Sequence, residues 1–182
     1  MNLDRVGYGN DIPNDVNVII EIPMAADPIK YEVDKETGAL FVDRFMGTSM
    51  HYPCNYGYIP HTIADDGDPV DVLVITPLPV QVGCVVRCRP IGMLNMKDEA
   101  GGDAKLLAVP IEKVLPVYRR IRKIDDVAPE TLAQIQHFFE HYKDLEKGKW
   151  VEVVGWEGPE SAAAEILAGI ARFEAAEVKP AF

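Results

Sequence analysis

Short runs of β-branched and aromatic residues, separated by turn residues, recur along most of the chain. Each run has the length and composition of a β-strand, and several are bounded by Gly, Pro, Asn or Asp. The runs are VNVIIEIP (16–23), IKYEVD (29–34), ALFVDRF (39–45), VDVLVI (70–75), CVVRCRPIGMLNM (84–96), AKLLAVP (104–110) and WVEVVGW (150–156).

Two later segments have helical periodicity instead. One begins at Pro129 and closes near Gly148, and the other begins at Pro159 and extends to about residue 178. The apolar positions that share one face of the first are Leu132, Ile135, Phe139 and Tyr142. Many short strands followed by late helices predict a mainly β (α+β) fold, a small barrel or sandwich with helices packed outside. Without a repeat, low-complexity segment or linker, we predict a single domain over residues 1–182.

Charge and cysteine content narrow the function classes. The net charge of −11 disfavours nucleic acid and anionic membranes as partners, because both require a positive surface. The start of the chain lacks the features of a signal peptide, and no apolar run approaches membrane-spanning length. Cys54, Cys84 and Cys88 form no disulfide framework and are best interpreted as reduced thiols, so we expect a cytoplasmic protein.

The segment IADDGDPVDVLVI (63–75) places four aspartates, Asp65, Asp66, Asp68 and Asp71, immediately before a predicted strand. Carboxylates this close raise each other's pKa unless a cation separates them. We expect Asp66 and Asp68 to alternate along an extended segment and to point the same way, with Gly67 permitting a tight bend. An EF-hand is excluded, because its first and twelfth positions would fall on Thr62 and Leu73.

A second acidic site lies at MKDEAGGDAK, where Asp98 and Asp103 flank a Gly-Gly turn. Each nearby pair of opposite charges, such as Lys30 with Glu32 or Asp103 with Lys105, is ordinary for a strand surface and stabilises little. Together, however, the carboxylates, lysines, Arg44 and tyrosines recur at strand ends, as if around one polar cavity. Oxygen-rich ligands suit Mg²⁺ or Mn²⁺, and adjacent Lys and Arg suit phosphate.

These residues resemble those of the soluble family I inorganic pyrophosphatases. DDGDPVDVLV is similar to the family's D-G-D-P-x-D signature, and the resemblance covers roughly residues 1–175 without a departure at any polar site position. The positions that match the family's substrate and metal contacts are Glu21, Lys30, Glu32, Arg44, Tyr52, Tyr56, Asp66, Asp68, Asp71, Asp98, Asp103, Lys105, Tyr142 and Lys143.

The resemblance implies a five-stranded, OB-like closed barrel with flanking helices and, for a bacterial-type chain of this length, a homohexamer. It implies an inorganic diphosphatase that hydrolyses pyrophosphate to two phosphates with several Mg²⁺ ions per subunit, Mn²⁺ or Zn²⁺ being substitutes, and with a metal-bound hydroxide as nucleophile.

The resemblance also assigns roles within that set. Asp66, Asp71 and Asp103 would hold the activating metal pair, with Asp71 shared, and Asp98, Glu32 and Asp103 would hold ions that arrive with substrate. Asp68 would accept the proton of the nucleophilic water. The phosphate clamp would consist of Lys30, Arg44, Tyr56, Tyr142 and Lys143, with Glu21, Tyr52 and Lys105 as supporting residues.

Two alternatives belong to other functional classes. HFFEH (137–141) matches the H-x-x-E-H zinc-protease motif, but the 41 residues that follow leave little chain for a third ligand. We therefore interpret His137 and His141, with Gln134 and Asp144, as a face turned to solvent or to another subunit. The second alternative is a barrel that sequesters Ca²⁺ or an anion without turnover, which Asp68, Tyr142 and Lys143 disfavour because storage does not require them.

Overall fold

The computed structural model describes residues 3–34, 36–99 and 101–180, and strands dominate it. The strands in this part of the chain are β1 (Gly9–Asp11), β2 (Asp15–Ile22), β3 (Ile29–Val33), β4 (Leu40–Phe45), β5 (Asn55–Tyr58), β6 (Asp71–Val74), β7 (Val85–Asp98), β8 (Gly101–Gly102), β9 (Lys105–Pro110) and β10 (Val151–Glu157). The helices are α1 (Pro129–His141) and α2 (Pro159–Ala175), with short 3₁₀ turns at Leu3–Arg5, Pro116–Tyr118 and Ile124–Asp126. All seven runs that were predicted as strands form strands, with boundaries shifted by at most two residues.

The main sheet closes on itself. Its neighbours run β2–β5–β6–β9–β7, and β7 then pairs back with β2, which makes a ring of five strands among the described residues. The β6–β9 pairing is parallel, while the other pairings around the ring are antiparallel. This ring confirms the predicted OB-like arrangement. The hairpin of β3 and β4 forms a separate two-stranded sheet beside it.

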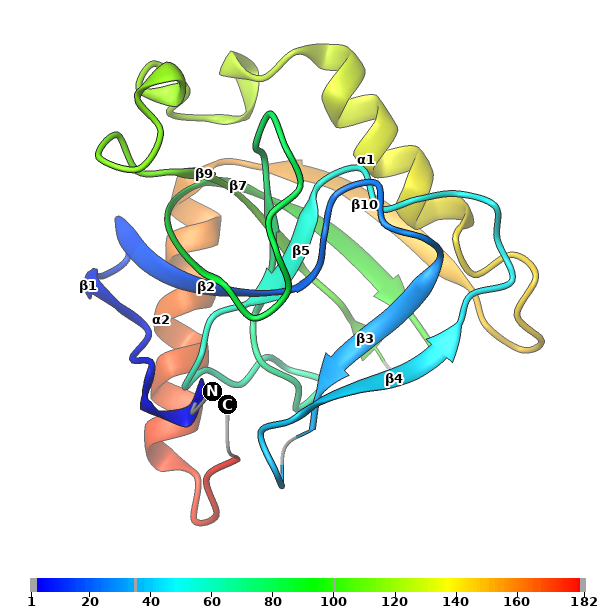
Figure 1. The fold of residues 1–182 in the computed structure, drawn as a ribbon, viewed down its shortest axis with the longest axis horizontal. Coiled ribbons are helices and arrows are strands. Elements are labelled where there is room, and N and C mark those ends of the chain that lie inside the picture. Colours follow the sequence, from blue (N-terminus) through cyan, green and yellow to red (C-terminus); the bar gives the residue numbers. More distant parts are fainter. Residues whose placement is uncertain (1–2, 35, 100, 181–182) are drawn as a thin grey trace.

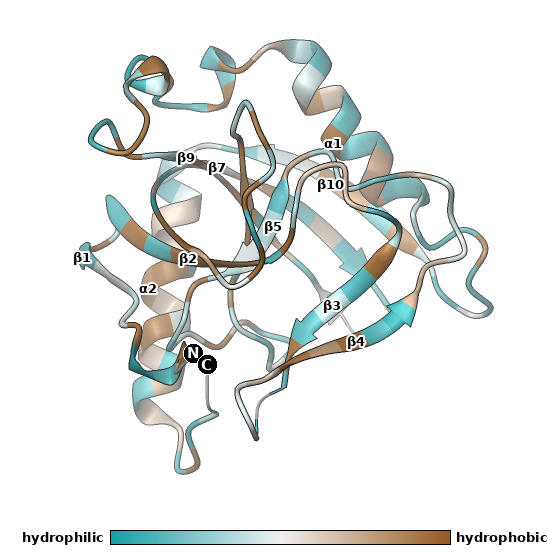
Figure 2. Ribbon diagram, in the orientation of Figure 1, coloured by the Kyte–Doolittle hydropathy of each residue, from teal (hydrophilic) through white to brown (hydrophobic). Residues whose placement is uncertain are grey.

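Alternation along the ring strands produces two apolar faces. Val72 and Val74 of β6 pack with Leu106 and Ala108 of β9 in a cluster that includes Ile166 of α2. The intervening side chains belong to a second cluster, which the buried face of α1 completes: Leu73, Leu107, Val109, Ile135, Phe138 and Phe139. Figure 1 shows α1 and α2 on opposite sides of the ring, and Figure 2 shows hydrophobic stretches along ring strands such as β2. The two helices therefore cover apolar surface that the ring alone would expose to water.

The helix that was predicted to reach Gly148 ends at His141, so this prediction was too long. Beyond His141 the backbone continues in tight turns, with Asp144 N–H bonded to the His141 carbonyl and Glu146 N–H to that of Lys143. Both Tyr142 and Lys143 are buried, and this turn brings them to the cavity described below. The second helix likewise ends earlier than expected, at Ala175.

Strand β5 was not predicted from the sequence, because NYGY lacks an alternating apolar pattern, yet all four of its residues are buried. Gly57 permits the pairing with β2: a Cβ at this position would lie 1.9 Å from the carbonyl oxygen of Ile19. The strands β1 and β8, three and two residues long, were also absent from the prediction. No helix in the described ranges is long and apolar enough to cross a membrane.

Candidate active site

A polar cavity of about 260 Å³ lies where the ring, the β3–β4 hairpin and the end of α1 meet. All fourteen site residues that were predicted from the sequence line it. They come from segments that are distant in the chain, including β2, β3, β4, β5 and β6. The other lining residues are Tyr31, Val33, Pro69, Glu99, Phe139 and Lys149.

The aspartate segment enters the cavity through a tight turn. Asp66 Oδ1 accepts the backbone N–H of Asp68 at 3.0 Å, and Gly67 has φ = 89°, which only glycine adopts readily. The expected extended alternation of Asp66 and Asp68 was therefore wrong, because the turn satisfies its own backbone donor with the Asp66 carboxylate. Both side chains nevertheless reach the cavity. Asp65 does not line it: its exposed carboxylate pairs with Arg172 of α2.

The cation that pairs with the partly buried Asp71 and Asp103 is Lys105. Its ammonium group contacts the Asp71 carboxylate and lies 2.5 Å from Asp103 Oδ1 and 3.4 Å from the Tyr56 hydroxyl. Burial raises the pKa of Asp71, with Lys105 opposing that shift. Burial also disfavours the charged form of Lys105, but Asp71 and Asp103 together outweigh it and hold the pKa of Lys105 well above its ordinary value. Lys105 is thus an internal counter-ion, more central than the supporting role expected for it.

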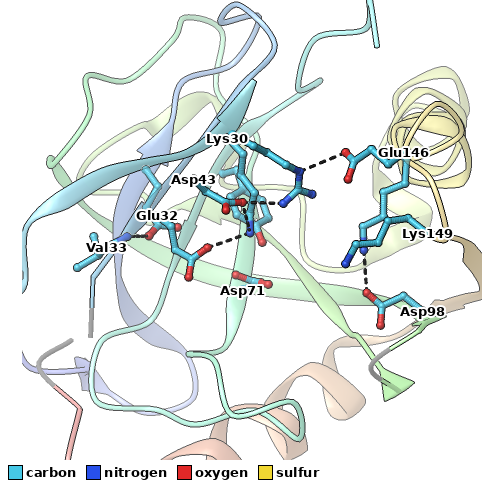
Figure 3. A network of polar contacts seen from close by, with 12 residues as sticks. Lys30, Glu32, Val33, Asp43, Asp71, Asp98, Glu146 and Lys149 are labelled. Carbon is cyan, nitrogen blue, oxygen red and sulfur yellow. Dashed lines mark hydrogen bonds and ion pairs between the residues drawn. The ribbon is translucent and has the colours of Figure 1, made fainter. Parts of the chain in front are cut away.

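The β3–β4 hairpin supplies two cations on another side of the cavity. Lys30 Nζ lies 3.0 Å from Glu32 Oε2 and 3.3 Å from Asp43 Oδ2. Arg44 is held by Asp43 at 2.6 Å and by Glu146 at 3.2 Å, and Figure 3 shows this chain of contacts from the hairpin to the segment after α1. Each cation therefore has a carboxylate that fixes its position before a substrate arrives.

Lys143 and Lys149 are the remaining two cations that line the cavity. Lys143 Nζ lies 2.8 Å from Asp98 Oδ2 and 3.9 Å from Glu99, which also pairs with Lys149. Glu99 and Lys149, like Asp43 and Glu146, were missed in the sequence analysis. Asp43 and Glu99 are direct neighbours of predicted residues, Arg44 and Asp98. Extending each motif by one residue would have included these two. Glu146 lies near the end of the segment that was predicted as helix and Lys149 directly after it, and neither position carried a spacing signal.

Aromatic contacts position the phenols of the site. The Tyr52 ring lies 5.1 Å from that of Tyr56 and 4.6 Å from that of Phe138, and Phe138 stacks on Tyr142 at 5.2 Å. Burial raises the pKa of Tyr52, Tyr56 and Tyr142. These hydroxyls therefore stay protonated at neutral pH and can donate hydrogen bonds to an anion.

Glu21 connects the ring to the hairpin. Its Oε1 accepts the backbone N–H of Val33 at 2.7 Å, which ties β2 to the end of β3. Burial raises the pKa of Glu21 to about 8, and the nearby carboxylates of Asp71 and Glu32 add to that shift. The Glu21 carboxyl group is therefore mainly protonated at neutral pH when no metal ion is bound nearby.

The donor set fits hard divalent cations. Asp66, Asp71 and Asp103 offer only oxygen ligands, and Lys105 already shows that this group requires positive charge. Among the described residues, no three of the cavity carboxylates bring ligand oxygens within 4.8 Å of one another. This spread suits ions that share carboxylates better than one closed cage.

Comparison with known proteins identifies the family and the fold. The family model described as inorganic pyrophosphatase matches residues 18–174. The chain belongs to the inorganic pyrophosphatase family. It is 63% identical over 172 residues to the inorganic pyrophosphatase of Escherichia coli (strain K12), covering 94% of this chain and 98% of that protein. The similarity to the inorganic pyrophosphatase of Ralstonia nicotianae is 59% over 174 residues, or 96% and 99% of the two chains.

Solved structures of the family share the fold. The inorganic pyrophosphatase of Coxiella burnetii superposes with a TM-score of 0.89 at 55% identity, over 92% of this chain and 99% of that one. For the Thermus thermophilus structure the TM-score is also 0.89, at 43% identity and 96% and 99% coverage. The resemblance drawn from the sequence is confirmed, and the chain is a hydrolase that acts on pyrophosphate. A zinc protease and a non-catalytic storage barrel are set aside.

Proposed function

We propose that this pyrophosphatase hydrolyses pyrophosphate in a Mg²⁺-dependent reaction within the 260 Å³ cavity. The observation that supports this most is the convergence of carboxylates from the aspartate turn and β7 with cations from the hairpin and the end of α1. One group of side chains suits metal ions, and the other suits phosphate oxygens.

The metal ligands in this proposal are Asp66, Asp71 and Asp103 for the activating ions, with Asp71 shared. Asp98 and Glu32, together with Asp103, would bind ions that accompany the substrate. When bound, the divalent ions lower the pKa of coordinated water and so supply a hydroxide nucleophile at neutral pH. Lys105, which now neutralises Asp71 and Asp103, would retain a share of both carboxylates and orient them.

The remaining side chains act on the proton and on the phosphates. Asp68 accepts the proton of the nucleophilic water at a carboxylate oxygen, since it lines the cavity next to Asp66. The leaving and attacked phosphates are bound by donors that are already oriented: Lys30, Arg44, Tyr56, Tyr142 and Lys143. Glu21 and Tyr52 support this group, Glu21 through Val33 and Tyr52 through its ring contacts.

Phosphate release from pyrophosphate, followed across a Mg²⁺ titration, tests the proposal. Wild type should require Mg²⁺, and Asp68→Asn should lose about 10²–10⁴-fold in kcat while its Mg²⁺ dependence changes little. Asp65→Asn is the matched control, because it removes a carboxylate from the same turn that does not line the cavity. Equal losses in the two variants, or loss of Mg²⁺ affinity alone in Asp68→Asn, would reject the role of Asp68.

Assembly and compartment remain part of the proposal. The resemblance implies a homohexamer, and a single chain exposes apolar side chains such as Phe41 and Phe45 on β4, which are 55% and 76% exposed. Sedimentation would show the oligomeric state directly. The cytoplasm is supported by the free thiols of Cys54, Cys84 and Cys88.

A further inference from the structure

Asp66 and Asp68 reach the cavity from a loop that leaves the ring after β5 and returns to it at β6. The ends of this loop meet at Ile59 and Val70, where the Ile59 N–H donates to the Val70 carbonyl oxygen at 3.0 Å. This bond holds the two ends together, but it does not fix the place of the residues between them. Those residues need a further anchor.

The hydroxyl of Thr62 binds both ends of the loop from inside. Its Oγ1 donates to the Ile59 carbonyl oxygen at 2.6 Å and accepts the Val70 N–H at 3.0 Å. The side chain is fully buried, so solvent does not compete for either bond. Thr62 does not line the cavity, and its effect on the reaction can only be indirect.

The turn that follows Thr62 is held by bonds within itself. The Ala64 N–H donates to the Asp68 carbonyl oxygen at 2.7 Å, and the Gly67 N–H donates to that of Ala64 at 3.1 Å. The Asp66 carboxylate closes the same turn by accepting the Asp68 N–H. These bonds preserve the shape of the turn without fixing its place relative to the ring. That place depends on the anchor at Thr62 and on the helix behind it.

Helix α2 packs against the loop from outside. The Ile63 N–H donates to the Gly169 carbonyl oxygen at 3.0 Å. A Cβ at Gly169 would lie 2.7 Å from Val70 Cγ2 and 3.3 Å from Thr62 Cβ. The carbon atoms of Thr62 therefore fill space against α2, while its hydroxyl binds the loop ends. Substitution can separate these two contributions of one side chain.

We propose that Thr62 is a positioning residue for hydrolysis, and that its hydroxyl holds Asp66 and Asp68 in place at the cavity. The inference rests on the proposed function, in which Asp66 binds an activating ion and Asp68 accepts a proton. In that function the phosphates are bound by side chains from other elements. Loss of the hydroxyl should therefore impair the chemical step more than substrate binding, because a misplacement of about 1 Å can cost about 10²-fold in rate.

Two substitutions of similar size separate the hydroxyl from the packing. Thr62→Val keeps the shape and removes both hydrogen bonds, whereas Thr62→Ser keeps both bonds and removes a methyl group. In Thr62→Val, kcat at saturating Mg²⁺ should fall about 10–100-fold, with KM for pyrophosphate changed by less than about 3-fold. Thr62→Ser should retain kcat within about 3-fold of wild type. Both variants should unfold at a lower temperature than wild type, since one leaves a buried N–H unpaired and the other loses packing.

Hydrogen exchange in the metal-free enzyme provides a readout that does not depend on turnover. The amides of Ala64 and Gly67 should exchange at least about 10-fold faster in Thr62→Val than in Thr62→Ser, because the turn opens more often. The matched control is Thr76→Val. It removes a hydroxyl that donates to the Leu78 carbonyl oxygen at 2.6 Å, accepts from Asn55 Nδ2 at 2.6 Å and does not line the cavity. This control should keep the kcat of wild type.

A Thr62→Val kcat within about 3-fold of wild type would overturn the proposal. An equal loss of kcat in Thr62→Ser or in Thr76→Val would do so as well, since activity would then follow stability instead of the hydroxyl. Thr62→Cys replaces Thr62→Val where that variant does not fold, because a thiol is only a weak hydrogen-bonding group. In that case, equal kcat in Thr62→Cys and Thr62→Ser would overturn the proposal.

Asp68→Asn in the same assay separates this inference from the proposed function. If Asp68→Asn keeps the kcat of wild type, the proposed function fails at Asp68, and the positioning role fails with it. If Asp68→Asn loses activity and Thr62→Val does not, only the positioning role fails. Loss in both, with rescue by Thr62→Ser, is the result expected.

Discussion

Replacing Lys105 by Met would remove the internal counter-ion of Asp71 and Asp103 while keeping most of the side-chain volume. The lysine is 5% exposed, and its ammonium group contacts both carboxylates. Met cannot neutralise them, so in the metal-free protein two partly buried carboxylates would lie close together without a cation. We expect the variant to be much less stable without metal and to recover when Mg²⁺ is added.

The magnitude follows from the burial of the group. Removing one partner of a buried ion pair costs about 3–5 kcal/mol, because the other charge remains buried without compensation. For a chain of this size each kcal/mol shifts the unfolding midpoint by roughly 2–4 °C, so the metal-free variant should melt on the order of 6–20 °C lower than wild type. Divalent ions at the same carboxylates would supply the missing positive charge and remove most of that difference.

Thermal unfolding in EDTA and in millimolar Mg²⁺ measures both quantities. Lys149→Met is the matched control: its ammonium group also lines the cavity but is half-exposed and paired with Glu99, so its loss should cost at most about 1 kcal/mol in either buffer. A Lys105→Met midpoint within a few degrees of wild type in EDTA would refute the counter-ion assignment. So would a deficit that Mg²⁺ leaves unchanged.

Three further predictions concern other parts of the cavity. Asp71→Asn should nearly abolish turnover and weaken Mg²⁺ binding, measured by calorimetry, by at least about 10–100-fold, because the proposed shared ligand loses its charge. Normal turnover of this variant at saturating Mg²⁺ would contradict the assignment. Tyr142→Phe should raise KM for pyrophosphate with the fold intact, since only a hydroxyl donor is lost; an unchanged KM and kcat would remove this hydroxyl from the site. Burial raises the pKa of Glu21 from 4.5 to about 8, so its contribution to the free energy of unfolding is complete below about pH 4.5 and is lost as the pH rises towards 8. In Glu21→Gln, the free energy of unfolding, measured with urea in EDTA, should therefore depend less on pH between about 4.5 and 8. The same pH dependence in wild type and variant would count against the raised pKa.

The strands of the ring could be predicted because their side chains alternate or form continuous apolar runs, as β6 and β9 do with every residue of β9 buried. Strand β5 could not be predicted in this way. Its pairing depends on the contact between Gly57 and the Ile19 backbone, which are far apart in sequence. The end of α1 was mispredicted for a related reason. The helical periodicity of the sequence continues past His141, but the chain turns there and brings Lys143 to Asp98.

The residues that line the cavity could be named as a set from the family resemblance, but their ion-pair partners could not. Glu146 lies 102 positions from Arg44 and meets it only in the folded chain. The same limit hid the central place of Lys105, which in sequence is one more lysine near an acidic turn. Only the fold shows that its ammonium group is buried between two carboxylates from different segments. Local sequence motifs therefore identify which residue types form the site, whereas tertiary contacts show which charged side chains pair with each other.

The charge balance of the cavity predicts that the proposed metal ions and the substrate depend on each other. Eight acidic and five basic side chains line it, which leaves an excess of three negative charges, or two when Glu21 is protonated. Pyrophosphate is itself an anion, and the chain as a whole carries −11, so the metal-free cavity repels its own substrate despite Lys30, Arg44 and Lys143. Two divalent ions at the carboxylates would reverse the sign of the cavity while leaving those cations oriented by Asp43, Glu146 and Asp98. The basic side chains alone therefore cannot select pyrophosphate. In the proposed function they would become a phosphate site only after metal ions have neutralised the carboxylates.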